Sequence, residues 1–353
     1  MSEDRLQDLG DLWIWFADHS TRDYSPLYDA VCRGVASDRE LLALVAEAPP
    51  TAHLPPLLLA TVHYLVLGGL DHPLAAVYTG DSTADPVPLF RDLCLSHRRE
   101  VLEVLAVRRV QTNEVGRSSL IGPALSWAAG RLGEPLSLID VGSSAGLNMI
   151  CDQFLLDYGP CGAIGPPDSD VVVECRVVSR PPPVPARLPA ISHRVGVDLD
   201  PPDLHDPDDA RWLLACVWPG TQRLARTERA IALARRDPPE VIEGDALRVL
   251  PDLLRGKDDG VRCVVTTWSF AYLRVEQRPA FVDILARAGQ ERPVVWIACD
   301  GRGLVELIDP GPAAEDGMTA DVMSAVTFDA DGAHPELLGF VHSHGRWLDW
   351  RAA

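Results

Sequence analysis

The sequence predicts an α/β protein in which an all-helical region precedes a doubly wound, Rossmann-like sheet of seven mainly parallel strands. Three observations support this fold class. Apolar residues recur at helical spacing up to about residue 131. After Gly133, short apolar runs alternate with helical segments, which is typical of a parallel sheet with helices on both faces. Two alternating runs joined by Asp331-Gly332 indicate an antiparallel hairpin at the C-terminal edge of the sheet.

Residues 1–132 form the predicted helical domain, which we expect to cover the sheet and to supply one wall of the site. Ser25 precedes a proline and is expected to cap a helix. Ser37, with Glu40 three residues later, predicts a capping box. The polar segment QTNEVGRSS, residues 111–119, interrupts the periodicity and is interpreted as a loop between helices.

Residues 133–353 form the predicted sheet domain. Its parallel strands are expected at short apolar runs, namely 136–141, 193–199, 240–244, 262–268 and 293–300. Helical periodicity fills the segments 147–159, 208–236, 246–255 and 276–289. An insertion at about 159–192 holds a strand-like run, DVVVECRVV, and a Pro-rich stretch that is interpreted as a rigid surface loop.

The composition narrows the range of partners. The 353 residues include 51 acidic side chains against 32 Lys and Arg, which gives a formal net charge of −19. Because affinity for nucleic acids comes largely from basic side chains, we expect no nucleic-acid partner. The longest apolar run, residues 57–67, is too short to cross a bilayer, and the acidic start does not resemble a signal peptide. We therefore expect a cytoplasmic protein that acts on a small molecule without a membrane partner; the sequence leaves its oligomeric state open.

The eight cysteines are scattered along the chain and lack the spacing of metal ligands. Free thiols are the expected state in a cytoplasmic protein. Asp200, Asp203 and Asp206 are close enough in sequence to resemble a metal site, but carboxylates at the start of a helix are the more common explanation. No metal is predicted.

The stretch LSLIDVGSSAGLNMICDQF, residues 137–155, has two interpretations. Gly142, Ser144 and Gly146 spell G-x-S-x-G, the nucleophile elbow of α/β-hydrolases, in which Ser144 is the nucleophile. With Asp140 included, the same residues form a glycine-rich turn that lets a backbone approach a nucleotide-like ligand. One interpretation gives a hydrolase, and the other gives a cofactor-binding enzyme.

Acidic residues follow the strands of the predicted sheet. Ligands of open parallel sheets bind outside the carboxyl ends of the strands, where the topology changes direction. Asp140 ends the first predicted strand, Asp198 the second, and Asp245 directly follows the third. A carboxylate can bind two ribose hydroxyls or the amine of an adenine, so these ends predict an adenosine site.

The sheet domain resembles the class I S-adenosylmethionine-dependent methyltransferases. The first motif of that class, an acidic residue followed by G-x-G-x-G, falls on Asp140 and residues 142–146, with Ser144 at a position where glycine is usual. The second and third motifs fall on Asp198 and Asp245. The segments SPLYDAV, VQTNEVGRSS, DVGSSAGLN, DARWLLACVWPG and EGDA are similar, over most of the chain, to an uncharacterised bacterial family of unknown function that joins a helical region to this sheet.

The resemblance implies a methyltransferase with S-adenosylmethionine as cofactor and S-adenosylhomocysteine as product. It implies the following cofactor contacts: Asp140, Gly142, Ser143, Ser144, Ala145, Gly146, Asp198, Leu199, Asp245, Ala246, Thr267 and Arg117. It also places four candidates toward the substrate: Asn113, Glu114, Trp268 and Tyr272. Glu114 and Tyr272 are the catalytic candidates, and Tyr64 is a further aromatic candidate. Without the resemblance, segment 111–119 is equally well a polar loop, and isolated aromatic residues are more often core residues.

Two alternatives remain. A hydrolase would need Ser144, Asp300 and His342 or His344 in that chain order, but no H-G-G-G-type segment precedes the elbow and the upstream region is helical. His342 and His344 alternate on one predicted strand, and a solvated or packed pair is the more common outcome. A scaffold protein that keeps the sheet but has lost its chemistry is the third class, since a fold does not imply activity.

Overall fold

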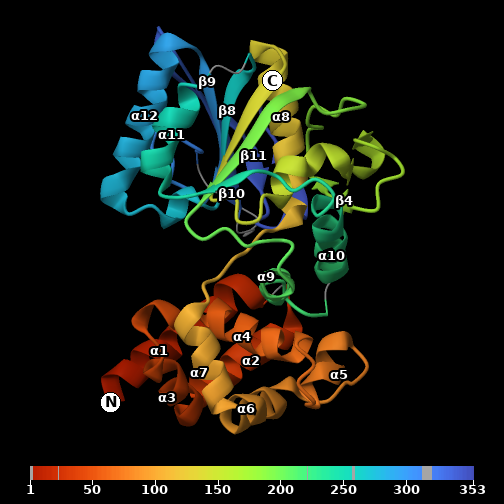
Figure 1. Cartoon of the computed structure of the whole chain (residues 1–353), viewed down its shortest axis with the longest axis vertical. Coiled ribbons are helices and arrows are strands. Elements are labelled where there is room, and N and C mark those ends of the chain that lie inside the picture. The colour runs from red at the N-terminus through yellow and green to blue at the C-terminus, as the bar shows by residue number, and fades with distance from the viewer. Residues whose placement is uncertain (1–2, 23, 221, 257–258, 312–319) are drawn as a thin grey trace. The chain divides into compact units, whose positions relative to one another are not determined.

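The computed structural model describes residues 3–22, 24–220, 222–256, 259–311 and 320–353 (Figure 1). The chain divides into two compact units. Unit 1 comprises Met1–Thr112 and His205–Thr227, and unit 2 comprises Asn113–Leu204 and Glu228–Ala353. Each unit has its own hydrophobic core. The expectation that the helical region forms a wall of the site stays a prediction.

Unit 1 is all-helical in its described residues. Its helices are α1 (Glu3–Phe16), α2 (Pro26–Ser37), α3 (Arg39–Glu47), α4 (Pro55–Leu67), α5 (Leu74–Thr79), α6 (Pro86–Ser96), α7 (Arg98–Val107) and α9 (Pro207–Ala215). Helix α4 is apolar around most of its circumference, so it lies at the centre, where α1, α5, α6, α7 and α9 contact it. Trp212 of α9 is 1% exposed and donates from Nε1 to the Arg109 carbonyl at 2.8 Å. The later segment 205–227 is therefore part of the helical core.

The two predicted helix caps have different outcomes. Ser25 caps α2, because its Oγ accepts from the Tyr28 amide at 3.2 Å. The predicted capping box of Ser37 and Glu40 is wrong. Asp38 caps α3 by accepting from the amides of Glu40 and Leu41, and Ser37 instead donates to carbonyls in the last turn of α2. Helix α3 begins one residue later than predicted, which leaves the Asp38 carboxylate as the acceptor at its N-terminus.

Unit 2 is built on one large sheet. In the part of the chain that the structure describes, this sheet has nine strands in the order β5-β12-β11-β10-β9-β8-β1-β6-β7. The strands are β1 (Leu136–Val141), β5 (Arg176–Val177), β6 (Ile191–Asp198), β7 (Val241–Glu243), β8 (Val261–Thr267), β9 (Val294–Asp300), β10 (Asp321–Asp329), β11 (Gly332–Val341) and β12 (Trp347–Trp350). Strands β1, β6, β7, β8 and β9 are parallel, β10 is antiparallel to β9, and β11 is antiparallel to β10. The predicted fold class is confirmed, with β5 and β12 added to the seven predicted strands.

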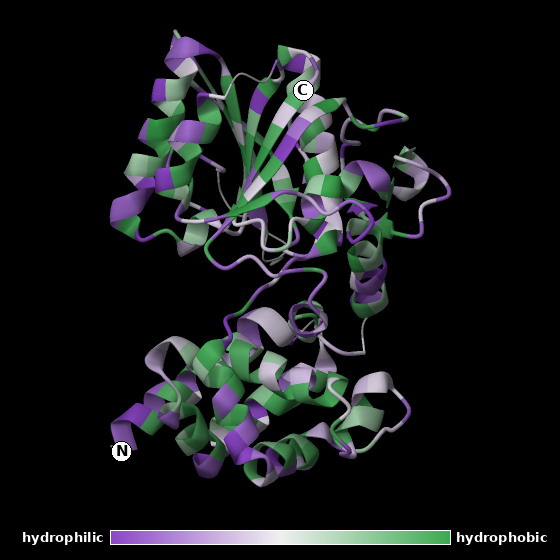
Figure 2. Ribbon diagram, viewed as in Figure 1, coloured by the Kyte–Doolittle hydropathy of each residue, from purple (hydrophilic) through white to green (hydrophobic). Residues whose placement is uncertain are grey.

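Helices cover both faces of the sheet. Figure 1 shows α11 (Ala246–Leu254) and α12 (Arg278–Glu291) on one side and α8 (Ser118–Leu132) on the other. Strands β1 and β9 are buried at every residue, which explains why their sequences are continuous apolar runs. In Figure 2 helices α11 and α12 alternate green with purple, as expected for helices with one buried face. This pattern leaves only the strand ends available for polar chemistry.

The predicted helix at residues 147–159 is wrong. The chain forms a 3₁₀ segment, η4 (Leu147–Gln153), and then a strand, β2 (Leu155–Asp157). Strand β2 pairs with β3 (Ala163–Ile164) and β4 (Val172–Glu174) in a small second sheet. A short apolar run fits a buried helix and a buried strand equally well, and pairing with the insertion favours the strand here.

The predicted helical segment 208–236 is two helices. Helix α9 ends at Ala215, and α10 (Gln222–Ala234) follows after Pro219 and Gly220. Proline and glycine interrupt the helical backbone at this point. Helix α10 begins in the residues of unit 1 and ends in those of unit 2.

Candidate functional site

The candidate site lies at the carboxyl edge of the sheet in unit 2. Strands β6 and β7 lie on one side of β1, and strands β8 and β9 lie on the other. The chain therefore reverses its direction of winding between β1 and β8, and such a switch point is where doubly wound sheets bind ligands. Strand β10 begins and strand β11 ends at this same edge, because Val322 of β10 pairs with Asp300 at the end of β9 and Asp321 pairs with Val341 at the end of β11.

The turn after β1 has a left-handed backbone at three residues. Gly142 has φ 74°, Ser144 has φ 53° and Gly146 has φ 76°. The Gly142 amide donates to the Val197 carbonyl at 2.8 Å, and a Cβ on Gly142 would lie 2.3 Å from Cβ of Ser269. Glycine at 142 is thus required by the packing of the protein itself. Ser144 carries the strain of a non-glycine residue in the left-handed region.

Asp198 holds this turn from the end of β6. Its Oδ2 accepts from the Ser144 amide at 2.8 Å, and its Oδ1 accepts from the Asp200 amide at 3.1 Å. The next residue, Leu199, is 73% exposed. The edge therefore presents a half-buried carboxylate beside an exposed apolar side chain.

Asp140 is buried directly below the turn, with 4% of its surface exposed. Burial raises its pKa to about 7; the charge of Asp198 adds to the rise, and Arg117 opposes it. Its Oδ1 has no hydrogen-bond partner within the described ranges, and the same holds for Oγ of Ser143 and of Ser144. Buried polar atoms without protein partners are normally satisfied by water or a ligand.

Arg117 brings a cation to the same edge. It belongs to η3 (Val115–Arg117); its Nη1 donates to the Thr267 carbonyl at 3.0 Å, and its Nε donates to the Ser343 carbonyl at 3.2 Å. The guanidinium lies 4.4 Å from the centre of the Trp268 ring. Predicted residues Arg117, Thr267 and Trp268 are therefore brought together.

Trp268 has φ 58°, a conformation that a bulky side chain rarely adopts. Its Nε1 donates to Oδ2 of Asp321 at 2.8 Å, and its amide donates to the Cys299 carbonyl at 2.7 Å. Strain of this kind is concentrated at functional sites.

The sequence analysis missed Asp321 and gave Asp300 a role only in the hydrolase alternative. Asp300 ends β9 and is 1% exposed. Burial raises its pKa to about 7, against the Ala271 amide and Arg117, which lower it. Burial also raises the pKa of Asp321, whereas Trp268 and Arg117 lower it. An acidic residue at the end of a buried strand was the signal that pointed to Asp140, and Asp300 carries the same signal.

Glu114, which is buried, and His344, which is half-buried, lie side by side. Nδ1 of His344 lies 3.3 Å from Oε2 of Glu114, whose side chain is 1% exposed. The predicted placement of His342 and His344 on one strand is wrong, because both lie in the turn between β11 and β12. In this turn Nδ1 of His342 accepts from the His344 amide at 3.0 Å. The alternation H-S-H fits a strand, but Gly345, with φ 70°, requires a turn.

The remaining predicted site residues have other surroundings. Asn113 Oδ1 accepts from the Leu147 amide at 3.0 Å, at the start of η4, and Asp245 caps α11 by accepting from the Leu247 amide at 2.9 Å. Ala246, the first residue of α11, is half-buried. Tyr272 is 82% exposed, and Tyr64 lies in unit 1, where its hydroxyl donates to Asp208. These contacts give Asn113 and Asp245 structural roles that need no ligand.

Other features of the chain give no competing site. Within the described residues, no group of three or more His, Cys, Asp or Glu side chains could hold a metal ion, and no helix is long and apolar enough to cross a membrane. Burial raises the pKa of seven thiols, at Cys32, Cys94, Cys151, Cys175, Cys216, Cys263 and Cys299, so these are weak nucleophiles.

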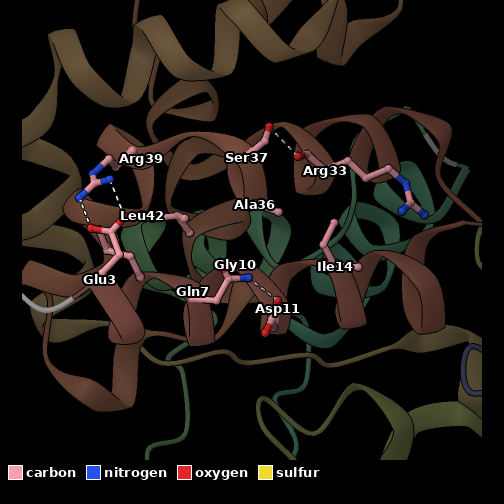
Figure 3. Close-up of a pocket in the computed structure, with 11 residues that line it drawn as sticks. Glu3, Gln7, Gly10, Asp11, Ile14, Arg33, Ala36, Ser37, Arg39 and Leu42 are labelled. Carbon is pink, nitrogen blue, oxygen red and sulfur yellow. Dashed lines mark hydrogen bonds and ion pairs between the residues drawn. The ribbon is translucent and has the colours of Figure 1, made fainter.

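A groove of about 280 Å³ lies in unit 1 between α1, α2 and α3 (Figure 3). Arg39 donates to Glu3, and Gln7 donates to Asp11 at 2.9 Å. Its polar side chains thus bind one another. The groove provides no unsatisfied group that would recognise a ligand.

Comparison with protein families matches residues 11–350 to a family described as "Uncharacterized protein conserved in bacteria" (DUF2332). No curated protein matches the chain.

Proposed function

The chain belongs to the DUF2332 family, and we propose that it binds S-adenosylmethionine at the carboxyl edge of its sheet and transfers the methyl group to a small molecule. One observation carries this proposal. Asp140 is buried at the switch point of the sheet, below a turn that Asp198 holds, and its Oδ1 has no partner among the residues described. The methyltransferase-like resemblance of the sequence supplies the identity of the ligand.

The surroundings of Asp198 suit an adenosine. Its carboxylate is half-buried, and its oxygens can accept from ribose hydroxyls as well as from the Ser144 amide. The exposed Leu199 side chain beside it offers an apolar surface to an adenine ring. A nucleoside bound here would cover an apolar side chain that water otherwise surrounds.

The charges at the edge suit the methionine portion. S-adenosylmethionine carries a sulfonium, an ammonium and a carboxylate. Asp140, with a pKa of about 7, becomes the partner of a cation when it ionises, and Arg117 is the partner available to the carboxylate. One edge therefore carries a carboxyl group for one of the two cationic groups and a guanidinium for the carboxylate.

For methyl transfer, the protein mainly has to position the two reactants. S-adenosylmethionine supplies a methyl group that is already activated as part of a sulfonium. The side chains at the edge have to place the acceptor in line with that methyl group and keep water out. Trp268, fixed by Asp321 and Arg117, is a rigid aromatic surface suited to that task.

The hydrolase alternative has one observation in its favour, the left-handed backbone of Ser144, which also occurs at nucleophile elbows. Two observations oppose the hydrolase. Oγ of Ser144 makes no hydrogen bond within the described residues, and the His344 ring is next to Glu114. A serine nucleophile needs a base within hydrogen-bond reach.

Calorimetric titration with S-adenosylmethionine and S-adenosylhomocysteine tests the proposal. We expect both to bind the wild-type protein. Asp198→Ala and Asp198→Asn should each weaken binding at least about 30-fold, since hydrogen bonds to a charged group contribute about 1.5–3 kcal/mol each. In Asp198→Asn the side-chain oxygen can still accept from the Ser144 amide, so this variant keeps that contact of the turn and loses the negative charge and the contact with the Asp200 amide.

Two controls accompany the titration. Glu243→Gln removes an exposed acid at the end of the neighbouring strand β7 and should leave affinity within about 3-fold. Ser144→Gly should also bind, because glycine suits the left-handed backbone of this position. If neither ligand binds the wild-type protein and a fluorophosphonate labels Ser144, the hydrolase is correct.

A further inference from the structure

We infer that His344 is the general base of the proposed methyl transfer and that Glu114 is the residue that positions it. The inference rests on the proposed function. It is carried by the 3.3 Å contact between Nδ1 of His344 and Oε2 of Glu114, in which the carboxylate side chain is 1% exposed and the imidazole is 18% exposed. A partly accessible imidazole supported by a buried carboxylate is the arrangement that general bases use.

Glu114 is fixed in its orientation. Its Oε1 accepts from the Gly116 amide at 2.8 Å, which leaves Oε2 directed at the histidine. The turn that carries His344 is fixed as tightly. A Cβ on Gly345 would lie 2.0 Å from the Gly116 carbonyl oxygen, and Ser119 Oγ donates to the carbonyls of both glycines, at 2.8 and 3.1 Å. Both partners therefore belong to one rigid contact between η3 and the β11–β12 turn.

This contact lies at the edge of the proposed cofactor site. Arg117 donates to the carbonyl of Ser343, the residue before His344, and to the carbonyl of Thr267 at the end of β8. The same guanidinium lowers the pKa of Asp140. One side chain thus connects the histidine turn to the switch point.

The chemistry follows from the tautomer. A carboxylate beside Nδ1 favours the proton on that nitrogen, so Nε2 keeps its lone pair. The proton of an acceptor hydroxyl moves to Nε2 while the hydroxyl oxygen bonds to the methyl carbon. The methyl–sulfur bond breaks, its electron pair stays on sulfur, and the products are a methyl ether, S-adenosylhomocysteine and an imidazolium. The acceptor class is therefore one whose accepting atom must lose a proton when it is methylated, as in an alcohol or phenol.

The base can be tested without a known acceptor. Nitrogen-15 NMR of the imidazole side chains should show His344 with its proton on Nδ1 in the complex with S-adenosylhomocysteine. Glu114 and His342 lie next to this ring, Arg117 binds the carbonyl of the preceding residue, Ser343, and Glu114 is the carboxylate among these groups. Glu114→Gln should therefore make protonation of His344 about 10-fold weaker. A proton on Nε2, or no change in the variant, would overturn the inference.

Turnover gives the second test. S-adenosylhomocysteine formation is measured with S-adenosylmethionine and a panel of phenols, aliphatic alcohols and tertiary amines. His344→Asn should lower kcat for the alcohol or phenol acceptor about 10²–10⁴-fold without a change in the dissociation constant of S-adenosylmethionine. His342→Asn is the matched control from the same turn and should keep most of the activity. The rate of the wild-type protein should fall at low pH, where the base is protonated.

The outcomes separate the two proposals. If S-adenosylmethionine does not bind the wild-type protein, the proposed function fails. If it binds but only tertiary amines are methylated, or His344→Asn is no slower than His342→Asn, the proposed function stands and the assignment of His344 is wrong.

Discussion

At the scale of single residues, the ionisation of Asp140 makes the stability of the protein depend on pH. Its pKa is raised from 3.8 to about 7 by burial and by Asp198, so the folded protein holds a proton that the unfolded chain releases. Between about pH 4 and pH 7 the folded state binds more protons. The stability that this proton contributes is therefore present at low pH and is lost as the pH rises through about 7.

We expect Asp140→Asn to remove this dependence. The free energy of unfolding, from urea titrations at several pH values between 5 and 8, should decline less with rising pH in the variant than in the wild-type protein. Between pH 5 and the pKa of about 7, each pH unit changes the free energy of unfolding by at most about 1.4 kcal/mol, so the difference should not exceed about 3 kcal/mol. Asp300, with a pKa also about 7, keeps its own contribution in both proteins.

The control is Glu243→Gln, which removes an exposed acid from the end of β7. It should keep the wild-type slope. Identical slopes in the wild-type protein and Asp140→Asn would show that the buried carboxyl does not titrate in this range.

The sequence predicted those residues of the edge that directly follow strands, and it missed the pair that meets only through tertiary packing. Asp140, Ser144 and Asp198 follow apolar strands, and the strand pattern was enough to place them together. His344 meets Glu114 only because η3 packs against the β11–β12 turn, 230 residues further along the chain. No spacing in the sequence reports such a pairing.

At the scale of elements, the contact between η3 and the β11–β12 turn depends on Gly345. Its φ is 70°, and a Cβ would lie 2.0 Å from the Gly116 carbonyl oxygen. We expect Gly345→Ala to lower the free energy of unfolding by about 4 kcal/mol or more, because the alanine meets backbone that cannot move aside. Urea titration followed by tryptophan fluorescence measures the loss.

Gly303→Ala is the matched control. Gly303 has φ 77° and nothing lies within 4 Å of the position of its Cβ, so the substitution adds left-handed strain alone. Such strain costs about 1–2 kcal/mol. Equal losses in the two variants would mean that the contact with Gly116 contributes nothing to stability.

Elements with a clear period were predictable from the sequence. The strands β1, β8 and β9 are buried at nearly every residue and rich in apolar side chains, and the Asp331-Gly332 pair correctly indicated the β10–β11 hairpin. Strand β2 was predicted as helix because a three-residue strand has no period of its own. Its identity depends on partners, β3 and β4, that lie within the insertion.

At the scale of the whole molecule, unit 1 is discontinuous in the sequence. Trp212, Ala215 and Cys216 belong to its core, although almost a hundred residues of unit 2 separate them from Thr112. The sequence does not reveal that the chain returns to unit 1 at α9, because this helix has the amphipathic pattern of a helix that covers a sheet.

A fragment of residues 1–132 should consequently lack a cooperative thermal transition in circular dichroism. A peptide of residues 205–227 should restore the transition, and the same peptide with Trp212→Ala should do so poorly, since loss of a buried tryptophan costs about 3–5 kcal/mol. A sharp transition of the fragment alone would show that α9 is not needed for the helical core.

Because unit 1 consists of two separate segments of the chain, its helices are synthesised at different times during translation. The helices α1 to α7 leave the ribosome long before α9, because 92 residues of unit 2 lie between Thr112 and His205. At about 5–20 residues per second, the apolar face of α4 waits roughly 5 to 20 s for its last partner. During that interval the nascent chain carries an unfinished hydrophobic surface that only the second segment of unit 1 can cover.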